Sequence, residues 1–96
     1  METKTIVETT TQVSKEYGVY DITIHSLDGV VIKISADVIA QVTEQDENGG
    51  YFKYGKKVTL VQENGDIDVV GTIPSDVLLG ILEEFDEIVN NLNNNL

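Results

Sequence analysis

Residues 74–92, PSDVLLGILEEFDEIVNNL, form the most regular stretch of the chain. Their apolar side chains recur at steps of three and four, which places them on one stripe of an α-helix. Acidic and amide side chains occupy the opposite side, and Ser75 or Asp76 is suited to cap the first turn. A helix this short is marginal in water, so we expect its stripe to pack on a sheet formed by the preceding residues. The stripe consists of Leu78, Ile81, Leu82, Phe85, Ile88, Val89 and Leu92.

Apolar and polar residues alternate on both sides of Asp28-Gly29, which predicts a β-hairpin. A two-residue turn would set Ile24 opposite Lys33 and split the apolar faces. A three-residue loop, with Gly29 in the left-handed conformation and a bulge beside it, sets Ile24 opposite Ile32 and keeps the apolar faces together. We therefore predict the three-residue loop.

A second hairpin is predicted around Asn64-Gly65, and here the same comparison of registers favours a two-residue turn. A two-residue type I′ turn pairs Leu60 with Val69 and keeps both on one face. Asn-Gly is the favoured pair for that turn.

The other segments before the helix give weaker signals. Residues 5–13 are rich in threonine and valine, which favours either an edge strand or an ordered arm, and residues 14–18 are typical of a turn. Residues 35–44 fit a short helix, but we prefer a strand because Val, Ile and Thr favour sheets. Residues 46–50, DENGG, predict a polar turn.

Residues 54–79 contain the second hairpin followed by GTIPS at 71–75. This stretch resembles the last strands of SH3-like barrels, which often end with a glycine, an apolar residue and a proline before a final turn. The tryptophan with which those domains bind proline-rich peptides is absent, since the chain has no Trp. The resemblance implies a small barrel or a strongly bent sheet.

Taken together, these signals predict an α+β fold. We expect a mainly antiparallel small bent sheet or SH3-like barrel of about five strands, with one C-terminal amphipathic helix packed on it. Ninety-six residues suit a single domain, here 1–96. The asparagine-rich tail predicts fraying at 93–96.

Composition restricts the classes of function. The chain has 17 acids, six lysines and no arginine, and its net charge of −11 disfavours direct binding to nucleic acid or membrane. It contains no cysteine, which excludes disulfides and thiolate chemistry. No apolar run approaches the length of a membrane span, and the first residues lack the apolar core of a signal peptide, so we expect a cytoplasmic protein.

Few residues suggest catalysis. The single histidine, His25, falls on the polar side of a predicted strand, where we expect a surface residue rather than a base. Asp66 and Asp68 are spaced to share a cation, but no third ligand follows at a suitable spacing. Phosphate-binding and zinc-binding motifs are absent. We expect a protein that is not an enzyme, with no cofactor and no metal.

The charge instead favours a non-enzymatic small acidic module that binds a protein with a basic surface. A sharper form of this hypothesis is an inhibitor that occupies a nucleic-acid-binding surface of its partner, as anti-CRISPR and anti-restriction proteins that imitate DNA do. The alternative is an assembly subunit that homo-oligomerises, for instance as a homodimer, through the C-terminal helix or a sheet edge. The residues predicted to bind the partner are Glu83, Glu84, Asp86, Glu87, Asp66, Asp68, Tyr51 and Tyr54.

Overall fold

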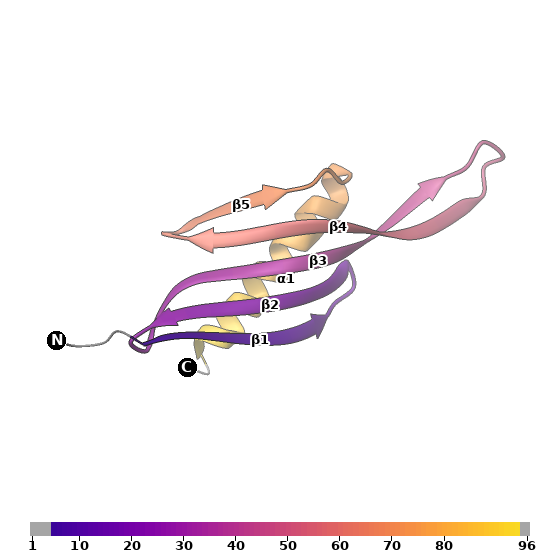
Figure 1. Cartoon of the computed structure of the whole chain (residues 1–96). Coiled ribbons are helices and arrows are strands. Elements are labelled where there is room, and N and C mark those ends of the chain that lie inside the picture. Colours follow the sequence, from indigo (N-terminus) through magenta and orange to yellow (C-terminus); the bar gives the residue numbers. More distant parts are fainter. Residues whose placement is uncertain (1–4, 95–96) are drawn as a thin grey trace.

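The computed structural model describes residues 5–94, which form one antiparallel sheet with one helix lying across a single side of it (Figure 1). Each strand pairs with the next strand along the chain, so the order in the sheet is β1-β2-β3-β4-β5. The predicted α+β class is therefore confirmed. The elements are β1 (Ile6–Ser14), β2 (Gly18–Leu27), β3 (Val30–Gln45), β4 (Tyr51–Glu63), β5 (Asp66–Val70) and α1 (Ser75–Asn94).

The sheet is open, and the predicted SH3-like barrel is wrong. A barrel closes only when its edge strands pair with each other. Here β1 and β5 remain at opposite edges, and β5 is only five residues long. The bent-sheet alternative describes the fold, with α1 covering the apolar side that barrel closure would otherwise enclose.

Residues 35–44 lie within β3, so the strand prediction is confirmed and the helical alternative is wrong. Val38, Ala40 and Val42 point to one side of the sheet and are fully buried. This alternation is the period-two pattern of a half-buried strand. The edge-strand alternative for residues 5–13 is confirmed from Ile6 onward, because these residues belong to β1, which pairs only with β2.

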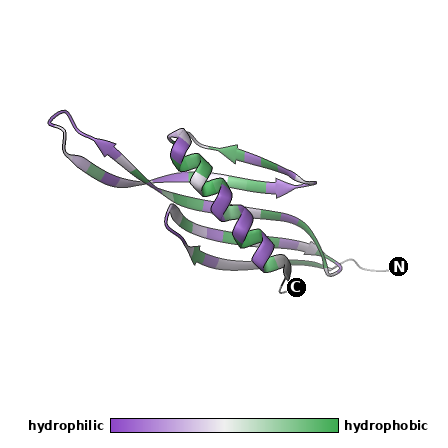
Figure 2. Cartoon of the chain, turned by 180° about the vertical axis from the view of Figure 1, so that it is seen from behind, coloured by the Kyte–Doolittle hydropathy of each residue, from purple (hydrophilic) through white to green (hydrophobic). Residues whose placement is uncertain are grey.

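Helix α1 packs its apolar stripe on the sheet, as predicted. Figure 2 shows the hydrophilic outward side of α1 and its diagonal path over the strands. The stripe joins residues of β2, β3 and β4 in one core. The helix extends to Asn94, and the end of the tail predicted to fray, 95–96, lies outside the described residues. The fully buried large side chains of this core are Tyr20, Ile22, Val38, Val58, Leu60, Ile81 and Phe85.

The first hairpin differs from its prediction. Asp28 and Gly29 both have positive φ, 51° and 82°, and form a two-residue turn rather than a three-residue loop. The extra residue appears further from the turn, where a bulge at Ile32 shifts the register. As a result Ile24 lies opposite Ile34, and the apolar faces still coincide. The turn takes the conformation that Asp-Gly prefers, and the bulge restores the buried face.

The second hairpin is confirmed. Asn64 and Gly65 have φ of 55° and 83°, as a type I′ turn requires. Leu60 lies opposite Val69, as predicted.

One hairpin projects from the rest of the molecule, as Figure 1 shows. Strands β3 and β4 continue beyond the last residue pairs that join them to β2 and β5, and residues 42–45 pair only with residues 51–54. We call residues 42–57 the arm and the other described residues the body. The arm contributes to an elongated shape with extents of 67 × 23 × 19 Å.

The two sides of the sheet are different. The side under α1 is apolar, and we call the opposite one the open side. In β2 and β3 the open side carries the odd-numbered residues from Val19 to His25 and from Lys33 to Thr43. Polar side chains link neighbouring strands there, as between Gln12 and Asp21 (2.8 Å).

Candidate functional site

The outward side of α1 carries acids that are free of internal partners, among them Glu83 and Asp86. Glu83 and Asp86 are exposed, and neither makes a hydrogen bond or ion pair with another described residue. Residues three apart on a helix are neighbours on its surface. These two carboxylates, which we call the helix ridge, therefore present adjacent negative charge on a rigid element.

Glu84, also predicted to bind the partner, is turned inward. Its carboxylate accepts hydrogen bonds from the backbone N–H of Tyr17, at 3.1 and 3.2 Å, and from the hydroxyl of Tyr20 at 2.6 Å. The ring of Tyr17 lies over Gly80, one turn before Glu84, where an added Cβ would come within 2.6 Å of it. Glu84 thus fixes the turn between β1 and β2 against the helix.

The contact with Glu84 also keeps the hydroxyl proton on Tyr20. Burial, the hydrogen bond to Glu84 and the charge of Glu84, in that order, raise the pKa of Tyr20 well above its usual range. The Tyr20 hydroxyl consequently stays a donor to the carboxylate at any ordinary pH.

Glu87 is the second acid of α1 with an internal role. It forms an ion pair with Lys15, in the turn between β1 and β2, with Nζ and Oε1 3.1 Å apart. The Lys15 side chain is 30% exposed and that of Glu87 is 61% exposed, so this pair contributes little to stability.

Val69 packs against the core on the side of the sheet that α1 covers. Because side chains alternate along a strand, Asp66 and Asp68 lie on the open side of β5. The sheet therefore separates them from the helix ridge. Among residues 5–94 no three His, Cys, Asp or Glu side chains are placed to hold a metal ion together. Among the described residues, no third ligand supports the hypothesis that Asp66 and Asp68 share a cation.

Tyr51 and Tyr54 lie in the arm. Tyr51 is 74% exposed, whereas the hydroxyl of Tyr54 donates to Glu44 at 2.7 Å, which raises the pKa of Tyr54. The ring of Tyr54 stacks on Phe52 with centroids 6.0 Å apart. The structure thus distributes the eight predicted residues over the helix, the open side of β5 and the arm, rather than bringing them together.

His25 has partners that the sequence did not suggest. Its Nδ1 lies 3.2 Å from Oε1 of Glu8, and its Nε2 lies 3.3 Å from Oγ of Ser35. The sequence of contacts, from a carboxylate to a histidine to a serine hydroxyl, resembles that of a serine hydrolase triad. However, Ser35 is in the central strand β3 with Thr23 and Val61 on either side, so the nearby strand amides are engaged in the sheet. The backbone N–H groups beside Ser35 are therefore not free to bind an oxyanion. Glu8, His25 and Ser35 instead link β1, β2 and β3 on the open side.

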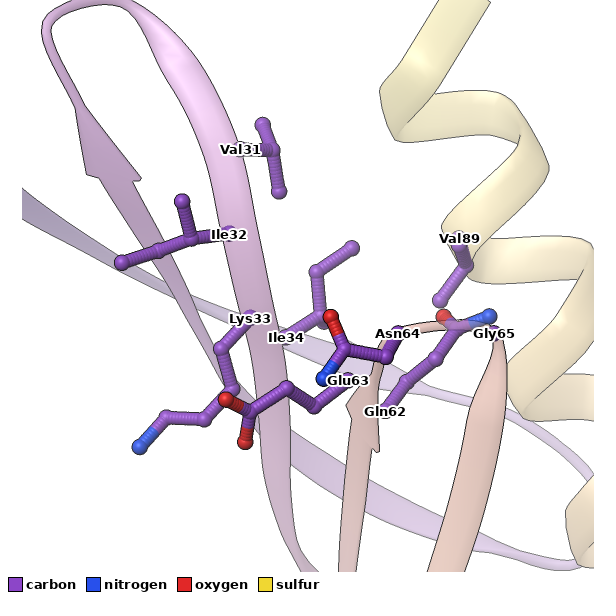
Figure 3. Close-up of a pocket in the computed structure, with 9 residues that line it drawn as sticks. All are labelled: Val31, Ile32, Lys33, Ile34, Gln62, Glu63, Asn64, Gly65 and Val89. Carbon is purple, nitrogen blue, oxygen red and sulfur yellow. The ribbon is translucent and has the colours of Figure 1, made fainter.

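A hollow of about 210 Å³ lies where β3 begins and β4 ends (Figure 3). The apolar residues Ile34 and Val89 face it from the helix side, while Lys33 and Glu63 extend away toward the open side. No polar side chain of the lining is buried, so no group there is held in place to orient a ligand. The lining residues are Val31, Ile32, Lys33, Ile34, Gln62, Glu63, Asn64, Gly65 and Val89.

Comparison with known proteins identifies no relative. A scan against protein-family models found none that matches, and searches of curated proteins and of solved structures gave no significant match. Over the described residues, no helix has both the length and the apolar character needed to span a membrane.

Proposed function

We propose that this chain is a non-enzymatic acidic binding module whose helix ridge occupies a basic surface of a partner protein. The observation that carries the proposal is the free and exposed state of Glu83 and Asp86 on a helix whose other side is anchored in the core. A rigid line of carboxylates complements a basic groove, with little ordering entropy to lose on binding.

A basic surface that binds a nucleic acid is the best-matched target. Such surfaces are shaped to accept closely spaced negative charges along a rigid backbone. The ridge supplies such charges, and the net charge of −11 favours rapid encounter with a basic partner. In this function the module inhibits its partner by excluding the nucleic acid.

Self-association through the apolar stripe of α1 is less favoured. Val77, Ile81, Phe85, Ile88 and Val89 are buried against the sheet. A second copy could reach them only if α1 left the core, at a cost of about 1.5–3 kcal/mol for each large side chain exposed.

The test is affinity capture from the native host with the immobilised chain, with bound proteins eluted by duplex DNA or by RNA. We expect a basic protein that either nucleic acid displaces, and we expect its capture to fail with Glu83→Lys/Asp86→Lys. The matched control is Asp66→Lys/Asp68→Lys, which makes the same change in charge on the open side. An equal loss of capture with both variants would mean that net charge, rather than the helix ridge, is responsible. Capture that survives Glu83→Lys/Asp86→Lys would refute the proposal.

A further inference from the structure

The two edges of the sheet differ in how well they are protected (Figure 1). β5 is five residues long and carries Asp66 and Asp68, and short, charged edge strands discourage further pairing. β1 is nine residues long, contains neither lysine nor proline, and keeps a regular register with β2 along its whole length. Its residues are exposed except for the partly buried Val13. Among the described residues, the edge at β1 is therefore long, regular and uncovered.

The backbone of β1 presents hydrogen-bonding groups along this edge. Near one end of the strand, the N–H of Lys15 donates to the carbonyl of Gly18 at 2.9 Å. At the other end, the N–H of Asp28 donates to the carbonyl of Thr5, also at 2.9 Å. Both bonds continue the β1–β2 register, so the odd-numbered residues of β1 bond to β2. The N–H and C=O groups of the even-numbered residues, 6–14, point outward, where no described strand lies.

The sequence of β1 is nearly symmetric about Thr10. Residues 7–13 read VETTTQV, with a valine at each end, a glutamate matched by a glutamine, and threonine at the central positions. Two antiparallel copies of this strand, centred on Thr10, therefore set similar residues opposite each other. Valine lies opposite valine, threonine opposite threonine and glutamate opposite glutamine, so no like charges are opposed.

The length and the backbone of β1 favour the same register. With Thr10 opposite Thr10, all nine residues of β1 are paired, and even-numbered residues lie opposite even-numbered residues. The outward N–H and C=O groups of the two copies then meet and form up to about ten backbone hydrogen bonds. A centre at Thr9 or Thr11 shortens the pairing and sets valine opposite threonine, and a centre at Glu8 opposes two glutamates.

We propose that β1 pairs with β1 of a second copy, antiparallel and centred on Thr10, to form a symmetric homodimer with one continuous sheet. A two-fold axis perpendicular to the sheet passes through the Thr10 pair. Because directly opposite residues lie on the same side of a sheet, both helices lie on one side of the joint sheet. Its two outer edges are then β5 strands, which discourage further pairing, so assembly ends at the dimer.

This dimer does not depend on the function proposed for the helix ridge. Glu83 and Asp86 lie on the outward side of α1, whereas the contact lies along the edge of the sheet. Both ridges therefore stay free and face the same way. Failure of either proposal would leave the other standing.

The experiment measures molar mass by sedimentation equilibrium from low micromolar to several hundred micromolar chain, at about 0.15 M salt so that repulsion between acidic chains is screened. We expect a monomer–dimer equilibrium for the unaltered chain. In the proposed register, the exposed Thr9 of each copy lies opposite the exposed Thr11 of the other. Thr9→Glu/Thr11→Glu, and separately Thr9→Lys/Thr11→Lys, therefore oppose like charges at both contacts.

The matched controls make the same substitutions at Thr43 and Thr72, which are exposed and lie outside β1. They change the net charge equally. Relative to its control, each β1 variant should dimerise at least about 10-fold more weakly. An equimolar mixture of the two β1 variants should dimerise more tightly than either variant alone, because opposite charges then meet at both contacts.

Amide hydrogen exchange followed by NMR tests the register. As the concentration of the unaltered chain rises, exchange should slow at the even-numbered residues of β1, because only their N–H groups gain partners in the dimer. A chain that stays monomeric over the whole range, or a dimer that survives both β1 variants, would overturn the proposal. So would controls that weaken as much as the β1 variants, a mixture no tighter than either variant, or even-numbered amides that exchange equally fast in the dimer.

Discussion

The body and the arm contain the same kinds of interaction in different surroundings. Each has one hydrogen bond from a tyrosine hydroxyl to a glutamate, Tyr20 to Glu84 at 2.6 Å in the body and Tyr54 to Glu44 at 2.7 Å in the arm. The first lies under the helix, and the second is open to water. The lengths are alike, so we expect burial, rather than geometry, to decide how much each bond contributes to stability.

The largest expected difference concerns the two phenylalanines. Phe85 is fully buried in the body, whereas Phe52 in the arm is 45% exposed. Phe85→Ala should lower the free energy of unfolding by about 3–5 kcal/mol through lost burial and a cavity. Phe52→Ala should lower it by less than about 1 kcal/mol. Urea unfolding at low micromolar chain measures both, and similar losses would mean that the arm belongs to the same cooperative core.

The two tyrosines sharpen the comparison. Tyr20→Phe should cost about 1.5–3 kcal/mol at neutral pH, because a buried hydrogen bond to a charged group is lost. Tyr54→Phe should leave the urea midpoint nearly unchanged, since water replaces the exposed bond. Equal shifts for both variants would contradict the role assigned to burial.

Tyr20 also gives the body a dependence on alkaline pH. Its raised pKa means that the folded chain keeps the phenolic proton at a pH where the unfolded chain releases it. Stability should therefore be fully present below about pH 10 and fall above it, by up to about 1.4 kcal/mol per pH unit from this group. In Tyr20→Phe that fall should be reduced, as measured by urea unfolding between pH 9 and 11, a range set about the usual tyrosine pKa of about 10.

The smallest expected difference concerns two glycines. A Cβ at Gly80 would lie 2.6–2.7 Å from three ring atoms of Tyr17, and one at Gly55 would lie 2.7 Å from Cγ2 of Ile39. The tyrosine is held by its backbone bond to Glu84, while the end of the half-exposed isoleucine can rotate. Gly80→Ala should therefore cost about 1 kcal/mol, despite the helix propensity that it gains. Gly55→Ala should cost less, and the reverse order would contradict this account.

The sequence predicted the body better than it predicted the arm. Periodicity identified α1, and alternation identified the buried faces of β2 and β3, because both patterns arise from burial on one side. The first hairpin failed in detail, since the register was corrected by a bulge at Ile32 and not by the turn. In the arm the predicted polar turn at 46–50 is confirmed, but residues 51–57 gave no clear strand signal, because a ribbon without a covered face imposes no strict alternation.

The predicted binding residues show the same division. Helical periodicity placed Glu83 and Asp86 on the outward side correctly. It could not show that Glu84 turns inward, because that depends on Tyr17 and Tyr20, more than 60 residues away in sequence. One signal was available: Gly80 precedes Glu84 by one turn, and a small residue in a helix marks a close approach by another element.

The position of α1 after all five strands has a consequence for synthesis on the ribosome. Neighbouring strands can join as soon as each turn emerges, but Lys15 and Tyr20, which bond to α1, lie 61–72 residues before their partners in the helix. At typical elongation rates, the 20 residues of α1 take about 1–4 s to add. During that interval the apolar side of the nascent sheet is exposed to water. We therefore expect the unfinished chain to be bound by chaperones that hold translating polypeptides.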